Sequence, residues 1–406
     1  MLADKLRAIS AASAPASKYA RVVTGALTTS GTCDITYSGG GTCDGAIILV
    51  SMATALNTDT NHASLSVCFF DGTTAYSAAN NSEDNQGRAD TQSAISSGLL
   101  IGGIDANAQD GAGSVATITD GIRITWSNTP SAAFRYVAVL FFGGVDIKAG
   151  YIFPSDTANG TATYSGADFI AQAGLFVYSN VNETFTGSFT TNETAQFHFG
   201  AFSFNNSTIT QRGFTAYDLD QANIAEIYSE AINTGINIVS GYDSHKVTAV
   251  GSTGFTLTTL GPSPDPQYFI FLLIGGITAA SLDDTAVPAS TGVKSWEGPG
   301  FQPSFILSAA SGFNTYNSAS TKEDINLAIG VHDGTTGGGV AVWCNDAAGT
   351  SDTGSRTNST AFLQSYQTTL AEQFAAQFDS FDSTGYNLDY TEVTSGLLGF
   401  TLALQL

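Results

Sequence analysis

Charged residues are scarce in this sequence, and basic residues are the scarcest. Only 13 Lys and Arg stand against 35 Asp and Glu in 406 residues, which gives a formal net charge of −22. Proteins that bind nucleic acid directly neutralise phosphates with clustered Lys and Arg, and this chain has no such cluster. The composition therefore argues against nucleic-acid binding and predicts an exposed protein that its acidic surface keeps soluble.

Cysteine is also scarce: it occurs four times, and never in a metal-binding spacing such as C-x-x-C. A zinc site is therefore not expected. Cys33 and Cys43 flank a Gly-rich turn, which leaves two alternatives, a local disulfide or small thiols in a reduced cytoplasmic product. The other two are Cys68 and Cys344. The four His residues form no H-E-x-x-H or related motif, so they predict no metal site.

Hydrophobic runs are too short for membrane-spanning helices. The run from Phe269 to Ile274 stops at two glycines, whereas a spanning helix needs roughly 20 apolar residues, so the run fits a buried strand. The N-terminal segment "MLADKLRAISAAS" carries Asp4 and has no continuous apolar region, so it does not predict a signal peptide. Its apolar residues at helical spacing predict a short amphipathic helix in an N-terminal extension of residues 1–20, formed by Leu2, Leu6 and Ile9.

Gly, Ser, Thr, Ala and Phe are abundant, and they form short alternating runs separated by turn residues, which is typical of an all-β protein. Three landmarks recur in the same order about 130 residues apart, which predicts an internal triplication. The first landmark is a glycine that opens an alternating strand, at Gly121, Gly254 and Gly385. The second lies in a buried strand before a turn, at Cys68, Gly200 and Gly330. The third is the aromatic residue of a TYSG-like motif, at Tyr37, Tyr164 and Trp296.

Each repeat has room for roughly seven to nine short strands, as expected of a two-sheet sandwich. We therefore predict an all-β protein with three tandem homologous β-sandwich domains of jelly-roll-like type, at residues 21–145, 146–277 and 278–406. The polar middle of each repeat differs between copies, and loop variation on a fixed scaffold is typical of regions that contact partners. In the second copy, one short helix is predicted by four residues at helical spacing, Ile224, Ile227, Tyr228 and Ala231.

The sequence contains no catalytic constellation, and the G-x-S-x-G motif of serine hydrolases is absent. Glycosidases need only two carboxylates, and Asp71 and Asp333 both end the repeated strand. Each precedes Gly, however, and Asp-Gly is the strong signal of a type I′ hairpin turn. We therefore predict turn residues at both positions, and no catalytic, cofactor-binding or metal-binding residue. Calcium binding stays open as an alternative to simple solvation in three loops without EF-hand spacing, residues 57–64, 82–90 and 344–355.

The third repeat carries a connected set of strand and turn motifs. Its segment "GFQPSFILSAASGFNTYNSASTKEDINLAIGVHDG" is followed by "QFAAQFDSFDSTGYNLDY". This pattern, a G-F-x-P-x-F-I strand, a G-x-x-D-G-like turn and an FDSxGF-like strand in which Tyr386 replaces the last Phe, resembles tandem β-sandwich modules of tailed-bacteriophage virion proteins. The first two repeats match it weakly. The second has Ser203 and Phe204 in place of Asp-Gly, and the first lacks the F-Q-P segment.

The resemblance implies a virion component with a β-sandwich scaffold, and it transfers no catalytic residue. We therefore expect a non-enzymatic structural protein of a tailed-phage virion, made in the host cytoplasm, that decorates the capsid or forms part of the tail or its fibres. The expected partners are other virion proteins and further copies of the chain, without nucleic acid or membrane. The alternative is a host-surface carbohydrate-binding adhesin or polysaccharide depolymerase that grips glycan with loop aromatic and acidic residues.

Overall fold

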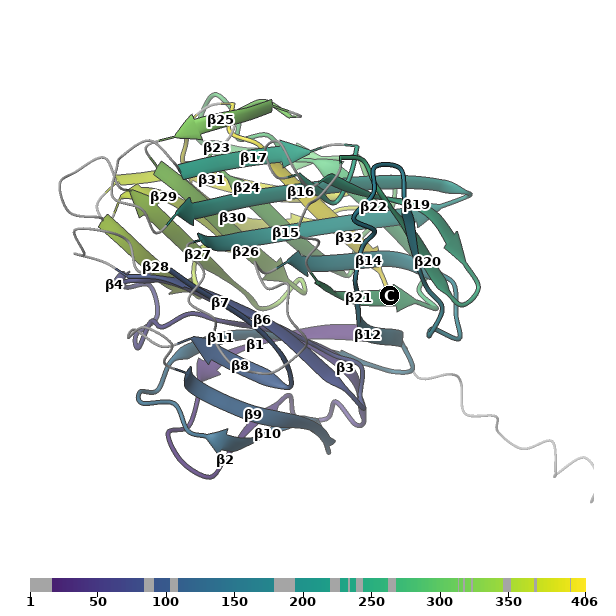
Figure 1. The fold of residues 1–406 in the computed structure, drawn as a ribbon, viewed down its shortest axis with the longest axis horizontal. Helices are drawn as coiled ribbons and strands as arrows, with labels where there is room; N and C mark the ends of the chain where they lie inside the picture. The colour runs from purple at the N-terminus through teal and green to yellow at the C-terminus, as the bar shows by residue number, and fades with distance from the viewer. Residues whose placement is uncertain are drawn as a thin grey trace, which may run out of the picture.

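The structure, a computed structural model, consists of strands, turns and loops throughout the residues that it describes (Figure 1). In that part of the chain 32 strands form six antiparallel sheets, which confirms the predicted all-β fold, and no helix is long and apolar enough to cross a membrane. The predicted helix of Leu2, Leu6 and Ile9 lies outside the described residues, while Tyr19, inside the predicted extension, begins a strand. The described residues are 17–83, 91–102, 109–178, 194–219, 227–232, 234–238, 244–261, 268–312, 314–316, 318–322, 324–345, 352–368, 371–394 and 396–406.

The sheets form three pairs, each with one large and one four-stranded sheet. In the first pair the large sheet has the order β1-β11-β3-β5-β6-β7, and the small sheet has the order β2-β10-β9-β8. The strands are β1 (Tyr19–Ala26), β2 (Thr32–Thr36), β3 (Cys43–Val50), β5 (Ala63–Phe70), β6 (Ala75–Ser82), β7 (Thr91–Ser97), β8 (Leu99–Gly102), β9 (Gln109–Ile118), β10 (Gly121–Asn128) and β11 (Arg135–Phe142). A further strand of this segment, β4 (Thr60–Asn61), pairs with the third large sheet.

The second pair repeats this arrangement with the orders β12-β21-β14-β15-β16-β17-β25 and β13-β20-β19-β18. Its strands are β12 (Asp146–Ile152), β13 (Thr161–Tyr164), β14 (Ala171–Tyr178), β15 (Thr194–Asn205), β16 (Thr208–Leu219), β17 (Ile227–Ile232), β18 (Asn237–Ile238), β19 (Ser244–Gly251), β20 (Gly254–Thr259) and β21 (Phe269–Gly275). The outermost strand of its large sheet, β25 (Ser318–Lys322), comes from the third segment of the chain.

The third pair has the orders β22-β32-β24-β26-β27-β28-β4 and β23-β31-β30-β29. Its strands are β22 (Ala279–Asp284), β23 (Gly292–Trp296), β24 (Phe305–Ser311), β26 (Asp324–His332), β27 (Gly337–Asn345), β28 (Asp352–Asn358), β29 (Leu363–Thr368), β30 (Ala371–Phe381), β31 (Tyr386–Glu392) and β32 (Gly399–Gln405). Each segment has more strands than predicted, because sequence patterns overlook edge strands such as β4 and β18, which are only two residues long.

The first sequence landmark, the strand-opening glycine, has a single structural cause in all three pairs. It stands at the start of the next-to-last strand, where the backbone of the small sheet's edge strand approaches closely. A Cβ at this position would overlap a backbone carbonyl oxygen, so a larger residue does not fit. The pairs of glycine and facing residue are Gly121 with Ile35, Gly254 with Tyr164, and Gly385 with Trp296.

The second landmark lies in the central strands β5, β15 and β26. Gly200 and Gly330 each face a backbone carbonyl oxygen that leaves no space for a Cβ. In the first pair the facing residue is itself a glycine, Gly98, and the Sγ atom of Cys68 lies 3.8 Å from its carbonyl oxygen. Gly98, Ile236 and Phe362 each directly precede the end strand of a small sheet, β8, β18 and β29, so the facing backbone is equivalent in all three pairs.

The apolar run of β21 is explained by burial on both faces of its sheet. Successive side chains of a strand point to opposite faces, and a strand covered on both sides reads as a continuous apolar run. One set faces a core shared with the other large sheets, and the other set faces the small sheet of its own pair. The first set is Ile270, Leu272 and Ile274, and the second is Phe269, Phe271 and Leu273.

The three large sheets share one hydrophobic core. Their inward-facing residues form a single cluster, which includes Leu49 of β3, Leu175 of β14 and Leu307 of β24. The opposite faces pack against the three small sheets and form three separate outer cores. Figure 1 shows the resulting arrangement, in which the sheet pairs surround a common centre instead of following one another in a row.

The helix predicted from Ile227, Tyr228 and Ala231 is wrong, because these residues lie in strand β17. Ile224 lies outside the described residues. The backbone of β17 pairs on one side with β16 and on the other with β25. Hydrogen bonding to two neighbouring strands thus overrides the helical spacing of the apolar residues, because tertiary context outweighs a local pattern.

The predicted type I′ geometry of the Asp-Gly turns is also wrong. A type I′ turn has positive φ at both central residues, but here only the glycines are positive, Gly72 at 81° and Gly334 at 86°. With the glycine first, this is the pattern of a type II′ turn. The type I′ pattern occurs at the corresponding hairpin of the second pair, where Asn206 and Ser207 have φ of 47° and 74°.

Candidate functional site

The three sheet pairs meet at three junctions that use the same two strand positions. The strand pairings place one residue of β6, one of β16 and one of β27 at equivalent positions of the three large sheets. They likewise place one residue each of β1, β12 and β22 at equivalent positions. The contacting pairs are Tyr76 with Tyr151, Arg212 with Asp284, and Gly338 with Thr24. One architectural contact is thus made by two aromatic rings, by an ion pair and by two small residues.

The carboxylates of Asp71 and Asp333 combine a turn role with a junction role. In both, Oδ1 accepts backbone N–H groups within the hairpin, from Thr73 and Thr74 in the first case. Oδ2 points to the next sheet pair: that of Asp71 lies 2.8 Å from Nζ of Lys148, and that of Asp333 accepts the backbone N–H of Val22 at 2.9 Å. The Asp71 side chain is only 2% exposed. Turn formation and docking therefore account for both carboxylates.

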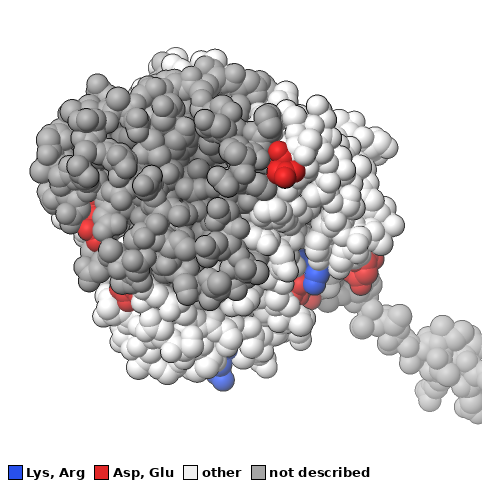
Figure 2. Space-filling view, viewed as in Figure 1, with Lys and Arg blue, Asp and Glu red and all other residues white. Residues whose placement is uncertain are grey.

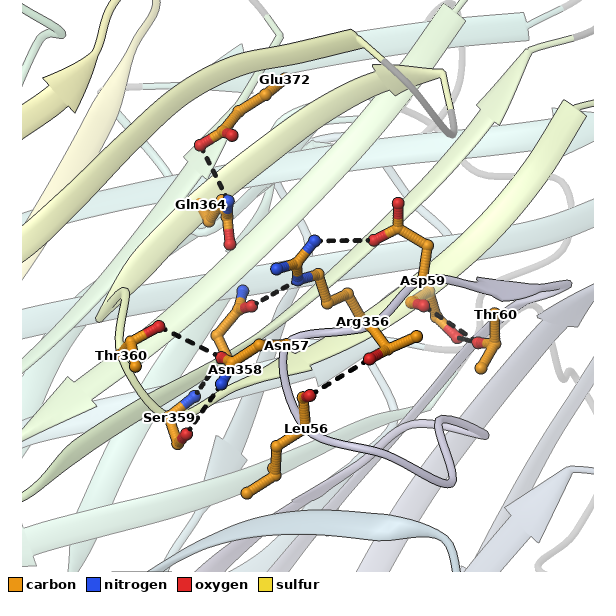
Figure 3. Close-up of polar contacts among 12 residues, drawn as sticks. Leu56, Asn57, Asp59, Thr60, Arg356, Asn358, Ser359, Thr360, Gln364 and Glu372 are labelled. Carbon is orange, nitrogen blue, oxygen red and sulfur yellow. Dashed lines mark hydrogen bonds and ion pairs between the residues drawn. The ribbon is translucent and has the colours of Figure 1, made fainter.

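The first and third pairs are joined by a polar cluster around Arg356, in β28 (Figure 3). Its Nη1 lies 3.0 Å from Oδ1 of Asp59, and its Nε donates to Asn358 at 2.8 Å. The side-chain oxygen of Asn57 accepts the backbone N–H of Ser359 at 3.0 Å. The loop that leads into β4 is thereby fixed to the third pair.

This cluster bears directly on the predicted alternative of calcium binding in loop 57–64. Asp59 and Asn57 supply oxygens of the type that calcium prefers, but protein donors already occupy those oxygens. Within the described residues, no group of three or more His, Cys, Asp or Glu side chains is placed to hold a metal ion. In the other two candidate loops, residues 84–90 and 346–351 lie outside the described part of the chain.

The junction of the second and third pairs contains an ion pair between Arg212 and Asp284. Nε and Nη2 of Arg212 lie 2.7 and 2.9 Å from the two carboxylate oxygens, and the Tyr316 hydroxyl donates to Oδ1 at 2.7 Å. Burial alone would raise the pKa of Asp284, but the hydrogen bonds from Arg212 and Tyr316 outweigh it, so this pKa falls below its usual value. The carboxylate is held ionised and serves docking.

The junction of the first and second pairs carries four partly exposed aromatic side chains. Tyr151 of β12 meets Tyr76 of β6 at a ring-centroid distance of 5.6 Å and meets Tyr268 at 5.8 Å. Phe153 continues the series, 4.7 Å from Tyr268. Tyr151 is 45% exposed and Phe153 is 42% exposed. We call these four residues the aromatic row.

Two of the shallow grooves each lie within a single sheet pair, although Arg212 of the second–third junction lines the first of them. One, of about 630 Å³, is lined by Ser207, Ile209, Thr210, Gln211, Arg212, Thr234, Lys246, Val247 and Thr248. The other, of about 460 Å³, is lined by Ser96, Ser97, Leu99, Gln109, Ala112, Gly113, Ser114, Thr125, Trp126 and Ser127. Neither lining includes a carboxylate or an imidazole, so neither groove supplies the acid and base groups of a hydrolase.

Two of the four histidines, His198 and His245, are buried in the second pair. The Nε2 atom of His198 lies 2.7 Å from the carbonyl oxygen of Ile236, which makes it the donor. Within the described residues neither ring nitrogen of His245 has a hydrogen-bond partner. Burial lowers the pKa of His198 to about 4 and that of His245 to about 3. Both rings are therefore neutral members of the core at physiological pH.

The remaining histidines also have local structural roles. His332 stacks on Phe378 with ring centroids 3.8 Å apart, and its Nδ1 accepts the backbone N–H of Gly334 at 2.9 Å. Burial lowers the pKa of His332 to about 4. The backbone N–H of His62 donates to Thr353, next to the short strand β4.

The cysteines take the reduced form of the two sequence alternatives. Cys33 and Cys43 are buried and form no disulfide, and the same holds for Cys68 and Cys344. Burial raises the pKa of the Cys43 thiol to about 12, which leaves little reactive thiolate at neutral pH.

The junction contacts are the functional candidates that the sequence did not identify. Tyr76 and Tyr151, or Asp59 and Arg356, are far apart in the chain, and neither residue of either pair belongs to a motif. The only signal they leave in the sequence is that equivalent positions of the three repeats carry residues of different chemical types. Recognising that signal requires the strand register, because the second hairpin is longer than the other two.

Comparisons with known proteins identify no family for the chain. No protein-family profile matches it, and no curated protein is similar to it. Among solved structures, the LG1-3 region of the laminin alpha2 chain is 8% identical over 94% of each chain, with a TM-score of 0.08. A score this low carries no argument about fold or function.

Proposed function

We propose that the protein is a non-enzymatic structural component of a tailed-phage virion, which decorates the capsid or forms part of the tail or its fibres. The strand and turn motifs of the third repeat support this proposal. We also infer that the sheet pairs are three copies of one domain. Their strand orders correspond, and the second and third copies begin near Asp146 and Ala279, the first residues of β12 and β22.

The observation that carries the proposal is the arrangement of three similar sheet pairs around one shared core. A single chain built in this way has three similar outward faces, and it fits a position where three copies of another virion protein meet. Within the described residues the small sheets end at strands β2, β13 and β23, which have no neighbour on their outer side. Such edges can pair with strands of adjacent subunits.

The surface chemistry fits a role in assembly better than one in catalysis. The carboxylates of Asp71, Asp284 and Asp333 are engaged in turns and junctions. On the face shown in Figure 2, the described surface carries isolated charged side chains separated by uncharged residues. A surface of this kind suits extensive contacts with neighbouring subunits, because few charges have to be desolvated.

Localisation on the particle tests the proposal. Virions of the phage that encodes the chain are labelled with gold-coupled antibody against the recombinant protein and imaged by electron microscopy. We expect label on the particle, spread over the head for a decoration protein or confined to the tail for a tail or fibre component. Label that remains in the unassembled fraction after virions are purified would refute a structural role.

The second candidate function is a host-surface carbohydrate-binding adhesin or a polysaccharide depolymerase. The aromatic row favours binding over cleavage, because it offers exposed rings and, among the residues that the structure describes, no unengaged carboxylate pair beside them. Incubation of the purified protein with polysaccharide separates the two activities. Release of reducing ends would establish a depolymerase and refute the non-enzymatic assignment.

A further inference from the structure

The aromatic row is not required by the architecture that contains it. At the equivalent positions of the other junctions Tyr76 corresponds to Arg212 and Gly338, and Tyr151 corresponds to Asp284 and Thr24. Those two junctions form without a ring pair at these positions. Phe153 and Tyr268, the other two members of the row, also have non-aromatic equivalents. Those of Phe153 are Ala26 and Ala286, and those of Tyr268 are Arg135 and Leu398.

Aromatic side chains that stay exposed to water gain little of the stabilisation that burial in a core provides. Tyr151 and Phe153, 45% and 42% exposed, are two of the five large hydrophobic residues that are at least 38% exposed in the described part of the chain. Contiguous patches of exposed apolar side chains often mark an interaction site, whereas apolar residues exposed singly do not. Because the internal repeats show that smaller or charged residues suffice here, the row points to a ligand.

We propose that the aromatic row is a binding site for a neutral glycan. The apolar C–H face of a pyranose ring stacks on an aromatic face, and adjoining rings can hold consecutive sugar units. Three of the four rings are tyrosines, whose hydroxyl groups can exchange hydrogen bonds with sugar hydroxyls at the rim of the stacked surface. The row thus combines the apolar and polar contacts that a sugar presents.

The electrostatics of the row favour a ligand without charge. Among the described residues, the ionic groups that act on Tyr76 are Lys148 and Asp71, which form a pair with an N–O distance of 2.8 Å and compensate each other. The hydrogen bond that Lys148 donates to Asp71 raises the pKa of Lys148, so the lysine stays charged and engaged. A polyanionic glycan would in addition be repelled by the formal net charge of −22 on the whole chain.

This proposal rests on the second candidate function, glycan binding, and is independent of the proposed virion role. A virion protein that binds glycan through the row would hold the particle on the host surface. Binding by the purified protein and localisation on the virion are separate measurements, so either result can fail while the other stands.

Native gel electrophoresis in gels that contain dextran, mannan or galactan tests the site. Two substitutions, Tyr151→Thr and Phe153→Ala, introduce the residues found at the equivalent positions of the first pair, Thr24 and Ala26, so the fold should accept them. Tyr37→Ala, which removes a 38% exposed tyrosine away from the row, is the matched control. Melting temperatures of all variants establish that they are folded.

We expect at least one of the three polysaccharides to slow migration of the unmodified protein and of the Tyr37→Ala control. The double variant should bind that polysaccharide at least 10-fold more weakly, as read from the polysaccharide concentration that gives half-maximal retardation. Retardation by none of the three, or equal retardation of the double variant, would overturn the proposal. Loss of a dimer in size-exclusion chromatography on double substitution, without a change in retardation, would identify a second copy of the chain as the occupant and would also overturn it.

Discussion

At the scale of single residues, glycine sets how closely neighbouring strands of a small sheet approach. Gly254 has φ of 152°, and a Cβ there would overlap the carbonyl oxygen of Tyr164. We expect Gly254→Ala to lower the free energy of unfolding by about 1–3 kcal/mol, because the backbone must shift to relieve the overlap. Gly251, in the same hairpin, has only one atom within 4.0 Å of an added Cβ. Urea denaturation of Gly254→Ala and Gly251→Ala measures the difference, and equal stabilities would contradict this explanation.

The buried histidines predict an acid-sensitive second sheet pair. In the unfolded chain a histidine takes up a proton near its ordinary pKa of 6.5, whereas folded His198 and His245 stay neutral down to pH of about 4 and 3. Their contribution to stability is therefore fully present above pH 6.5 and is lost as the pH falls below it. The loss is about 1.4 kcal/mol per pH unit for each histidine until the folded pKa is reached.

The substitution His245→Phe removes one of these two titrating groups and keeps an aromatic ring next to Phe269. We expect the free energy of unfolding of this variant to fall less steeply between pH 6.5 and 4 than that of the unmodified protein. Denaturant titrations at pH 7, 6 and 5 give the slope. A slope that His245→Phe leaves unchanged would show that other groups control the acid response.

At the scale of strands, the short β4 depends on side chains more than on its backbone ladder. It pairs with β28 at two positions only, and the Asp59 and Arg356 pair adjoins it. The two side chains are 20% and 19% exposed, so their interaction is less screened than that of a surface pair. We expect a coupling energy of about 1 kcal/mol from a double-mutant cycle with Asp59→Ala and Arg356→Ala.

The pair of Asp34 and Arg123 provides the control for that cycle. It joins β2 and β10 inside one small sheet, and its side chains are 38% and 46% exposed. Although its geometry is bidentate, solvent should reduce its coupling energy below that of Asp59 and Arg356. A larger coupling for Asp34 and Arg123 would mean that β4 is held by its backbone hydrogen bonds and neighbouring polar residues.

Element identity could be predicted from the sequence where burial imposes a pattern. The run from Phe269 to Ile274 predicted a buried strand, because side chains on both faces of this strand are buried and the run is therefore continuously apolar. Ile227–Ile232 was misread as helical, since one of its strand partners, β25, comes from the third segment of the chain and leaves no local signal. The aromatic row was missed for the same reason: Tyr76 and Tyr151 become neighbours only when two sheet pairs meet.

At the scale of the whole molecule, the shared core makes the three sheet pairs depend on one another. The inner faces of the large sheets form one cluster of apolar side chains, in addition to the separate core inside each pair. Strand exchange adds to this, because β4 lies in the third large sheet and β25 lies in the second. A sheet pair that lost its neighbours would expose one whole apolar face to water.

Cooperative unfolding follows from this dependence. We expect one calorimetric transition in which the van't Hoff and calorimetric enthalpies agree, because no pair can open without exposing the shared core. Leu272→Ala, which removes a side chain from the shared core, should shift the entire transition, with a loss of about 2–5 kcal/mol. Three resolved transitions, of which Leu272→Ala moves only one, would mean that each pair is stabilised by its own outer core and that the shared core is only an interface between independent domains.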